Sequence, residues 1–215
     1  MGVEDDKRAA AEAAAALVEP GMRLGLGTGS TVAHLLPALA ARRIPLRCIA
    51  TSPRTATAAR RLGLDVESFD TTGSPARIDL AVDGADQVAP DGWLVKGAGG
   101  AHTREKIVAA SADRFVVIVD ATKPVPVLRP PIPLELLEFG LASTLHRLAT
   151  ASLRDAPRSP DGGVLADYTG PIHDPAALAA HLASVPGVVD HGLFPPGLVD
   201  TVLVGRDGQV DVVVP

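Results

Sequence analysis

The feature that most constrains the fold of this chain is the alternation of short apolar runs with helix-forming stretches. The expected strands are 22–27, 46–51, 64–69, 78–83, 93–96 and 114–120, and the expected helices are 3–18, 32–41, 53–62 and 104–112. Strands that alternate with helices form parallel sheets with helices packed on both faces. We therefore expect an α/β fold with a doubly wound, mostly parallel, Rossmann-like sheet.

Composition places the chain among ordinary globular proteins and excludes several functions. Hydrophobic residues make up 47% of the 215 residues, and the net charge of −5 comes without a long basic block, which argues against a nucleic-acid partner. Residues 1–7 are acidic and lack an apolar signal-peptide core, and no apolar run approaches ~18 residues, so we expect a cytoplasmic protein that does not span a membrane. The single cysteine, Cys48, allows no intrachain disulfide and is expected to be a buried, inert thiol.

A glycine-rich turn joins the first expected strand to the helix at 32–41. Its sequence is Gly25-Leu26-Gly27-Thr28-Gly29-Ser30-Thr31. The first-turn amides of a helix lack partners within the helix and the helix dipole favours negative charge there, so this turn indicates an anion site. The spacing is not that of a dinucleotide fingerprint, and no lysine follows the glycines as in a triphosphate loop. A monophosphate ester fits better, and the alternative is a helix merely capped by Ser30.

A pair of carboxylates follows the strand expected at 78–83. Asp83 ends this strand, and Asp86 follows after Gly84 and Ala85. Ligands bind at the carboxyl ends of the strands in open α/β sheets. The two carboxylates could therefore hold sugar hydroxyls or relay protons, or the Asp-Gly pair could be a structural turn.

The stretch from Lys96 to Lys106 combines a lysine, a flexible backbone and a carboxylate. Glycine lets the backbone of 97–100 approach a ligand closely, and its amides can point at an oxyanion or a phosphate. Lys96 supplies a compact positive charge, and Glu105 supplies a carboxylate able to take a proton. The alternative is a tight strand–loop–helix connection with ordinary surface charges.

Four expected strands end in glycine or in charged residues, and one parallel sheet would bring these ends to the same edge. The ends are Gly27, Asp83, Lys96 and Asp120. Lys123 follows closely and adds a basic group, whereas Lys7 would matter only if the start of the first helix faces this edge. Together these signals predict a ligand site at the edge.

The sequence changes in character after Pro124. Prolines mark a linker, and strands are expected at 132–136, 164–168 and 188–193, with helices at 137–149 and 175–184. This order indicates a small α+β domain. The last expected strands, 201–204 and 210–214, would rejoin the first domain. We therefore expect a first domain of 1–127 plus 198–215 and a second of 128–197.

These motifs resemble ribose-5-phosphate isomerase, type A. The segments that carry the resemblance are 25–31, 83–86, 96–99, 103–106 and 120–123, and the late segments 161–167 and 186–194 are also similar. The likeness covers essentially the whole chain in order. The chain departs from the family's usual residues at Gln87, Ala98 and His102. Ala98 limits positive φ in its loop, and His102 either perturbs Glu105 or is solvated.

The resemblance implies an interconversion of D-ribose 5-phosphate and D-ribulose 5-phosphate through a cis-enediol(ate), without a metal, nucleotide or other cofactor. Glu105 would be the catalytic base. Lys96 and the amides of Gly97, Ala98 and Gly99 would stabilise the developing negative charge. Asp83 and Asp86 would hold hydroxyls, and Asp83 would help to open the furanose ring.

The resemblance also implies a phosphate site, a lid and an oligomer. The phosphate would lie on Thr28, Gly29, Ser30 and Thr31, with Lys123 and Lys7, and Gly84 and Ala85 would complete the substrate site. The small domain would be a ferredoxin-like lid, and the protein would be a homodimer or a homotetramer. No histidine pair has metal-ligand spacing, so no metal site is expected.

The sequence leaves two other functions open. An amino-sugar phosphate deaminase and a non-catalytic sugar-phosphate sensor both share such a sheet. The sensors usually carry a DNA-binding head, and no basic helix-turn-helix precedes Met22, which disfavours a sensor.

Overall fold

The computed structural model describes residues 2–214, and contacts divide the chain into two compact units. The first unit comprises Met1–Ala85, Arg104–Lys123 and Gly197–Pro215, and the second comprises Asp86–Thr103 and Pro124–Pro196. The expected domains differ from these units mainly because they place residues 86–103 in the first domain. That division into domains stays a prediction.

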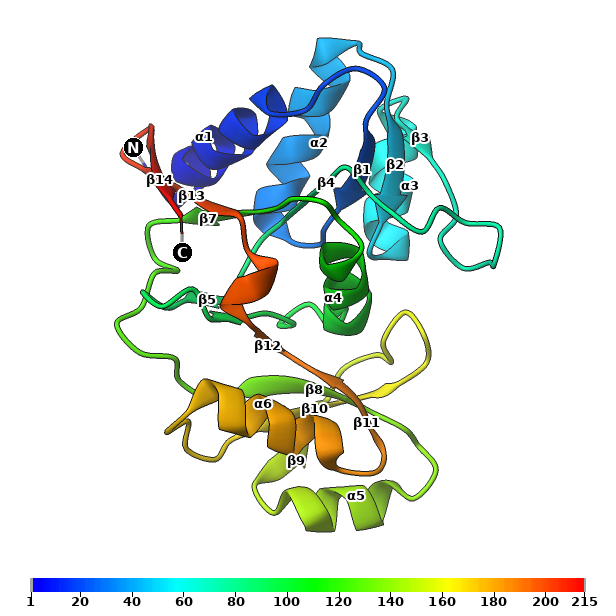
Figure 1. The fold of residues 1–215 in the computed structure, drawn as a ribbon, viewed down its shortest axis with the longest axis vertical. Coiled ribbons are helices and arrows are strands. Elements are labelled where there is room, and N and C mark those ends of the chain that lie inside the picture. Colours follow the sequence, from blue (N-terminus) through cyan, green and yellow to red (C-terminus); the bar gives the residue numbers. More distant parts are fainter. Residues whose placement is uncertain (1, 215) are drawn as a thin grey trace. The chain divides into compact units, whose positions relative to one another are not determined.

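The first unit is built on a seven-stranded sheet with the order β14-β13-β7-β4-β1-β2-β3 (Figure 1). The strands are β1 (Arg23–Leu26), β2 (Arg47–Ala50), β3 (Asp65–Val66), β4 (Leu80–Asp83), β7 (Phe115–Asp120), β13 (Thr201–Arg206) and β14 (Gln209–Val213). Neighbouring strands are parallel except for β13 and β14. The predicted α/β fold with a mostly parallel sheet is therefore confirmed, and the last two strands join that sheet as expected.

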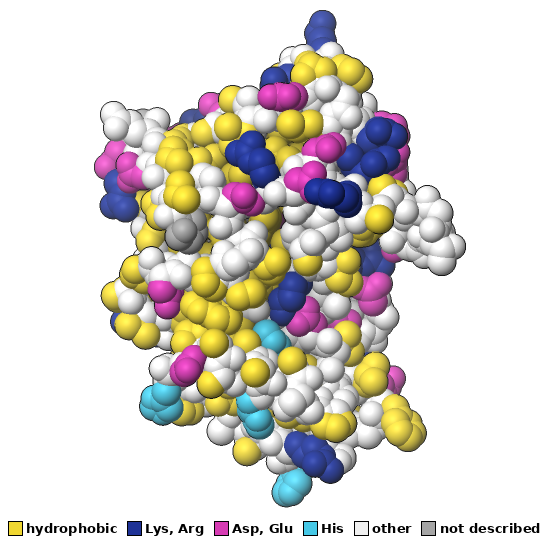
Figure 2. Space-filling model, in the orientation of Figure 1, with side chains coloured by type: hydrophobic (Ala, Val, Ile, Leu, Met, Phe, Trp, Pro, Cys, Tyr) yellow, Lys and Arg dark blue, Asp and Glu magenta, His cyan; other side chains and the backbone are white. Residues whose placement is uncertain are grey.

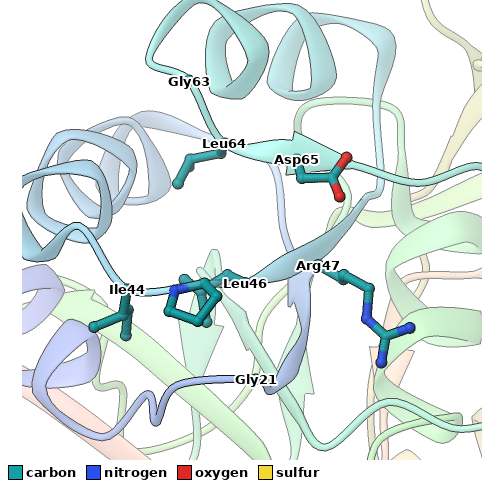
Figure 3. A pocket seen from close by; sticks show the side chains of 8 residues that line it. Gly21, Ile44, Leu46, Arg47, Gly63, Leu64 and Asp65 are labelled. Atoms are coloured by element: carbon teal, nitrogen blue, oxygen red, sulfur yellow. The ribbon is translucent and has the colours of Figure 1, made fainter.

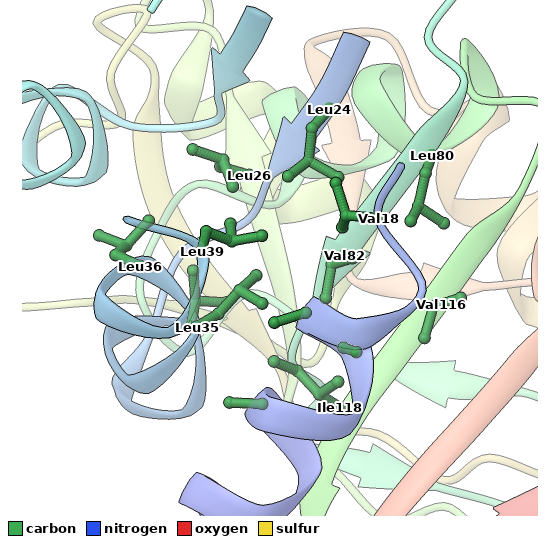
Figure 4. Close-up of a cluster of buried hydrophobic side chains, with 14 of the residues drawn as sticks. Val18, Leu24, Leu26, Leu35, Leu36, Leu39, Leu80, Val82, Val116 and Ile118 are labelled. Carbon is green, nitrogen blue, oxygen red and sulfur yellow. The ribbon is translucent and has the colours of Figure 1, made fainter. Parts of the chain in front are cut away.

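Helices cover both faces of this sheet. They are α1 (Val3–Ala16), α2 (Ser30–Arg42), α3 (Pro53–Arg61) and α4 (His102–Ala110). Leu24 and Leu26 of β1 join the apolar core with α1 and α2 on one face (Figure 4). Gly25 lies between them and faces the other side, where a Cβ would come within 2.5 Å of Val108 on α4. The sheet is thus doubly wound, as the alternation of strands and helices predicts.

The core of the first unit follows from the periodicity of its elements. Leu35 and Leu39 lie one turn apart on α2, so both point at the sheet (Figure 4). Val82 of β4 and Ile118 of β7 are buried in the same cluster. Burying one such side chain stabilises the fold by about 2 kcal/mol relative to leaving it in water.

The second unit contains a four-stranded antiparallel sheet with the order β11-β8-β10-β9. Its elements are β8 (Ile132–Leu136), α5 (Leu141–Leu148), β9 (Ala151–Leu153), β10 (Val164–Tyr168), α6 (Pro175–Ser184) and β11 (Val188–His191). This is the ferredoxin-like βαββαβ arrangement that the resemblance implies. The helix expected at 137–149 begins later, because Gly140 adopts φ +73° as its cap. The strand β9 is too short to give a periodic signal in the sequence.

Two helices begin at a capping residue that is followed by a proline, and both starts agree with the positions expected from the sequence. Ser52 caps α3 and accepts from the Thr55 amide at 3.2 Å. Asp174 caps α6 and accepts from the Ala176 amide at 2.9 Å. A proline follows each cap, and it suits the first helical position because no N–H is needed there.

The second unit also contains a small sheet that corrects one expectation. Its antiparallel strands are β5 (Gln87–Val88), β6 (Leu94–Val95) and β12 (Leu193–Phe194). The prediction that 93–96 belongs to the parallel sheet is therefore wrong. The turn at 90–92, with Gly92 at φ +83° and the Ala89 amide bonded to the Trp93 carbonyl at 2.9 Å, folds β6 back onto β5. Lys96 consequently does not end a strand of the seven-stranded sheet.

The 3₁₀ helix η1 (Pro196–Leu198) connects the small sheet to β13. No helix among residues 2–214 has the length and apolar character needed to cross a membrane.

Acidic and basic side chains are interspersed over the face shown in Figure 2. Arg23 and Glu67 form an ion pair at 3.0 Å, and a partly exposed pair of this kind contributes at most about 1 kcal/mol.

Candidate active site

The order of the seven-stranded sheet defines where a ligand would bind in the first unit. From β1 the chain continues to β2 on one side, whereas from β4 it continues to β7 on the other side (Figure 1). Open α/β sheets bind ligands at the carboxyl ends of the strands where the order reverses, which here are β1 and β4. Gly27 follows β1 and Asp83 ends β4, so two of the predicted strand ends meet at this point.

The turn after β1 is the start of a helix without a side-chain cap. Gly29 occupies the cap position of α2 at φ +129°, a conformation that favours glycine, and Ser30 is the first helical residue. The alternative in which Ser30 caps the helix is therefore wrong. An uncapped first turn on a helix of 13 residues is suited to bind an anion.

A cluster of hydroxyl groups supports this turn from behind. The Thr28 hydroxyl lies 2.8 Å from both the Thr51 and Ser52 hydroxyls. Thr55 donates to the Gly27 carbonyl at 3.0 Å. The side chain of Thr28 thus braces the turn within the protein. The supporting residues were missed from the sequence, although the Thr51-Ser52-Pro53 run at the end of β2 was a visible signal.

Asp83 is buried and its carboxylate organises the same turn. Its Oδ1 accepts from the amides of Gly84 at 2.7 Å and Thr28 at 3.1 Å. A Cβ at Gly27 would lie 1.9 Å from Oδ1, so only glycine leaves room for the carboxylate. Asp83 and the glycine-rich turn before α2 therefore form one connected structure.

Two lysines predicted for the phosphate lie near the same edge of this unit. Asp120 Oδ1 accepts from the Thr122 amide at 2.9 Å, and this turn carries Lys123 away from the end of β7. The Asp6 carbonyl packs against Gly205, which pairs with Asp120, so the start of α1 lies at this edge. The role of Lys7 at the phosphate stays a prediction.

The ammonium of Lys7 is bound by a local carboxylate. Its Nζ lies 2.7 Å from Glu4, which also lies 3.0 Å from His34 Nε2. Hydrogen bonds from Lys7 and then from His34 hold the pKa of the exposed Glu4 carboxyl below its usual value. Lys7 would have to exchange this partner, or share it, to hold a phosphate.

Glu105 lies in the first turn of α4 and is buried, with 5% of its surface exposed. The helix is fixed to the sheet through Val108, which packs on Gly25. Burial of this kind removes a carboxylate from competing water, which suits a catalytic base.

In the second unit, Lys96 is buried beside an aromatic ring. Its Nζ lies 5.4 Å from the centre of the Phe194 ring, and its amide donates to the Gly192 carbonyl at 2.8 Å. A cation over an aromatic face is stabilised by the ring's quadrupole. The side chain is 2% exposed, so its charge acts in a medium that screens it weakly.

The loop after Lys96 is a tight turn. Gly97 and Gly100 have φ of +108° and +73°, and the Gly100 amide donates to the Gly97 carbonyl at 3.0 Å. Ala98 is not among the residues with positive φ, so its departure from the family's glycine introduces no backbone strain.

Asp86 binds this loop directly. Its Oδ2 accepts from the Ala98 amide at 2.9 Å. The Ala98 amide therefore differs from those of Gly97 and Gly99, because a protein carboxylate already accepts from it. His102 is fully buried in the same unit, so of the two alternatives for this residue the one in which it is solvated is wrong.

The chain passes between the two units four times, and three of these passages lie at predicted site motifs. They fall between Ala85 and Asp86, between Thr103 and Arg104, and directly after Lys123. The first unit thus carries Asp83, Glu105, Lys123 and the glycine-rich turn before α2. The second carries Asp86, Lys96 and the glycine loop.

A cavity of about 520 Å³ opens at the amino ends of β1, β2 and β3 (Figure 3). Leu64 and Asp65 line one wall and Ile44, Leu46 and Arg47 line the other. None of the predicted site residues lies here, and this edge of the sheet is opposite to the one that binds ligands in α/β proteins.

Among residues 2–214, no cluster of three or more His, Cys, Asp or Glu side chains is placed to hold a metal ion.

These features define a class of protein: a doubly wound α/β protein with an uncapped helix N-terminus and a buried carboxylate at its switch point, joined to a ferredoxin-like unit. The family model described as ribose 5-phosphate isomerase A (phosphoriboisomerase A) matches residues 47–209. The chain belongs to this family.

Curated relatives are similar to this chain over all or nearly all of its length. A ribose-5-phosphate isomerase A from Caulobacter sp. (strain K31) is 47% identical over 230 residues and covers 100% of both chains. One from Halobacterium salinarum is 46% identical, covering 98% of this chain and 96% of its own.

Solved structures show the same fold. The ribose 5-phosphate isomerase A of Methanocaldococcus jannaschii is 33% identical, with a TM-score of 0.91 and full coverage of both chains. A D-ribose-5-phosphate isomerase in complex with phospho-erythronic acid is 33% identical, with a TM-score of 0.92 and the same coverage.

Two further similarities are weaker. The family model described as the DeoR C terminal sensor domain matches residues 3–87, which is less than half of the chain. The translation initiation factor eIF-2B of Pyrococcus horikoshii is 16% identical with a TM-score of 0.58, and this likeness shows the fold alone.

Proposed function

We propose that this chain is an aldose–ketose isomerase that interconverts D-ribose 5-phosphate and D-ribulose 5-phosphate, with Glu105 as its base. Membership of the ribose 5-phosphate isomerase A family over the whole chain is the observation that carries this proposal. A solved relative holds phospho-erythronic acid, a phosphorylated sugar acid, and the proposal extends this class of ligand to the present chain.

The reaction moves one proton between adjacent carbons. Glu105 removes the proton from C2 of the open-chain aldose, and the electron pair of the C–H bond forms the C1–C2 double bond of a cis-enediolate. The electron pair of the C1 carbonyl moves onto O1, which then takes the proton of the C2 hydroxyl. The same carboxylic acid returns a proton to C1, and O2, having lost its proton, becomes the carbonyl oxygen of the ketose. The buried position of Glu105 supports this role, because a base needs to meet its substrate without competing water.

Negative charge develops on the enediolate oxygen and needs a stabilising cation. We assign this role to Lys96, with the amides of Gly97 and Gly99. The buried ammonium of Lys96 supports the assignment, since preorganised charge is most effective in a weakly screening environment. Asp83 and Asp86 hold the sugar hydroxyls, and Asp83 assists opening of the furanose ring.

The phosphate is assigned to the uncapped start of α2 at Thr28–Thr31, with Lys123 and Lys7. The helix terminus and the glycine at the cap position support this assignment. Fixing the remote phosphate orients the reacting carbons and converts binding energy into rate. We further propose a cytoplasmic homodimer or homotetramer that needs no metal or other cofactor.

A coupled assay with ribose 5-phosphate tests the proposal. The wild-type protein should form ribulose 5-phosphate and should release no ammonia from glucosamine 6-phosphate. Ammonia release without isomerisation would instead identify the amino-sugar deaminase. Binding of the sugar phosphate without turnover would identify the sensor.

A further inference from the structure

The peptide between Gly97 and Ala98 is held at both of its polar ends by side chains of the second unit. Arg154 Nη1 donates to the Gly97 carbonyl at 2.8 Å, from 57 residues away in the chain. Asp86 Oδ2 accepts from the Ala98 amide at 2.9 Å. The peptide therefore cannot rotate without breaking a bond at each end.

Arg154 is itself fixed in place. Its Nε and Nη2 donate to the two carboxylate oxygens of Asp167 on β10, at 2.8 and 2.5 Å. The side chains are 15% and 23% exposed. A two-point pair of this kind fixes the plane of the guanidinium, and it leaves Nη1 pointing at the glycine loop. The Arg154 amide also bonds to the Leu165 carbonyl at 3.0 Å, which anchors the backbone.

The loop needs such support because its backbone is intrinsically soft. Gly97 has φ +108°, and glycine rotates among several backbone conformations at little cost. Rotation of the 97–98 peptide would exchange its N–H and carbonyl directions. Because the Ala98 N–H points at Asp86, this rotation would turn the Gly97 carbonyl toward that carboxylate and disturb the loop that presents the amides of Gly97 and Gly99. These amides are the proposed donors to the enediolate, and preorganised donors stabilise such a charge without rearrangement.

We infer that Arg154, oriented by Asp167, is a positioning residue that keeps the Gly97–Ala98 peptide in the orientation that isomerisation requires. The inference rests on the proposed function, because the required orientation is the one that suits an enediolate. Arg154 acts through the loop, with its own charge neutralised by Asp167.

The substitution Arg154→Met tests the inference with a matched control. We expect kcat to fall about 10- to 100-fold with a change in KM below about threefold, as is usual when a supporting contact behind an active site is lost. Arg158→Met is the control, because Arg158 lies four residues after Arg154. Among the described contacts its side chain binds only the exposed Glu138, at 2.7 Å. Its kcat should stay at the wild-type value.

A double-mutant cycle with Asp167→Asn separates positioning from general destabilisation. Both single variants should lower kcat, and the double variant should be little worse than Arg154→Met, because the two residues act through one contact. Arg154→Lys keeps the charge but not the two-point pair, so it should also lose most of the activity while remaining folded.

Hydrogen exchange of the Ala98 amide gives a readout that does not depend on activity. Exchange should accelerate at least about tenfold in Arg154→Met and stay unchanged in Arg158→Met. Unchanged exchange in Arg154→Met, or a folded Arg154→Lys with full kcat, would overturn the inference. A wild-type protein that fails to convert ribose 5-phosphate would instead overturn the proposed function, whatever the exchange data show.

Discussion

Individual residues of the site owe their positions to contacts that are distant in the chain. Asp83 requires glycine at Gly27, and the two lie 56 positions apart. The candidate site residues could be predicted from the sequence, because an Asp at the end of a buried strand and a Gly-Ser-Thr turn before a helix are local patterns that indicate a ligand site. The hydrogen-bond partners of Thr28 and Gly97 could not be predicted from the sequence. Thr51 and Arg154 lie far from them in the chain and come into contact with them only in the folded structure.

Lys123 offers a test at the level of one side chain. Replacement by alanine removes one cation from the proposed phosphate site, so KM for ribose 5-phosphate should rise about tenfold, which corresponds to about 1.4 kcal/mol. The value of kcat should change less. Lys123→Arg keeps the charge and should retain most of the affinity. Steady-state kinetics would remove Lys123 from the phosphate site if KM were unchanged in Lys123→Ala.

Cys48 gives a prediction about pH. Burial raises the pKa of its thiol to about 12, with the nearby Asp65 and Glu67 as lesser causes. The folded state therefore keeps the thiol protonated when the unfolded chain, near 9.0, has lost the proton. This contribution to stability is complete below pH 9 and is lost as pH rises toward 12, by at most about 1.4 kcal/mol per unit.

Urea unfolding between pH 8 and pH 11 measures this effect, with Cys48→Ala as the control. The unfolding free energy of the wild type should decrease more steeply with pH than that of the variant. Equal slopes would show that the thiol does not titrate differently in the two states. The thiol should also resist Ellman's reagent at pH 8 until the chain is unfolded.

At the scale of elements, the helices and strands of the parallel sheet were predicted well, whereas the small antiparallel sheet was not. The parallel strands and α1 to α4 follow from apolar runs and helix signals of several residues each. The strands β5, β6 and β12 are two residues long and are defined by pairing, so their sheet has no sequence period to detect. The Pro90-Asp91-Gly92 turn was the available sign that β6 folds back.

The central strand β8 carries a buried carboxylate that ties three elements together. Glu135 is 2% exposed and accepts hydrogen bonds from Thr103 at 2.5 Å and from Ser159. Thr103 stands two residues before Glu105, so this carboxylate supports the start of α4. Removal of a buried acceptor leaves its donors unsatisfied, at a cost of about 1–3 kcal/mol each.

We therefore expect Glu135→Ala to lower the unfolding free energy by about 2 kcal/mol or more. Glu138→Ala is the matched control, because Glu138 lies three residues on with an exposed side chain, and it should change stability by less than about 0.5 kcal/mol. Chemical denaturation compares the two. A similarly small effect in both variants would show that Glu135 is not a structural anchor.

At the scale of the whole molecule, the residues proposed for the site are divided between the two units. The turn at 28–31, Asp83 and Glu105 belong to the seven-stranded unit, and Asp86 and the Lys96 loop belong to the ferredoxin-like unit. The family model matches residues 47–209 and the Caulobacter relative covers the full length of the chain, so the similarity spans both units. Three of the four passages between the units lie at the predicted site motifs.

The most direct test of the account is the conversion of ribose 5-phosphate in heavy water, followed by NMR, for the wild type and Glu105→Gln. Glu12→Gln, an exposed change on α1, is the control for the substitution itself. The wild type and the control should form ribulose 5-phosphate with deuterium at C1, and Glu105→Gln should be slower by about 10²-fold or more while remaining folded. A Glu105→Gln variant that keeps near-wild-type turnover and deuterium incorporation would contradict the assignment of the base.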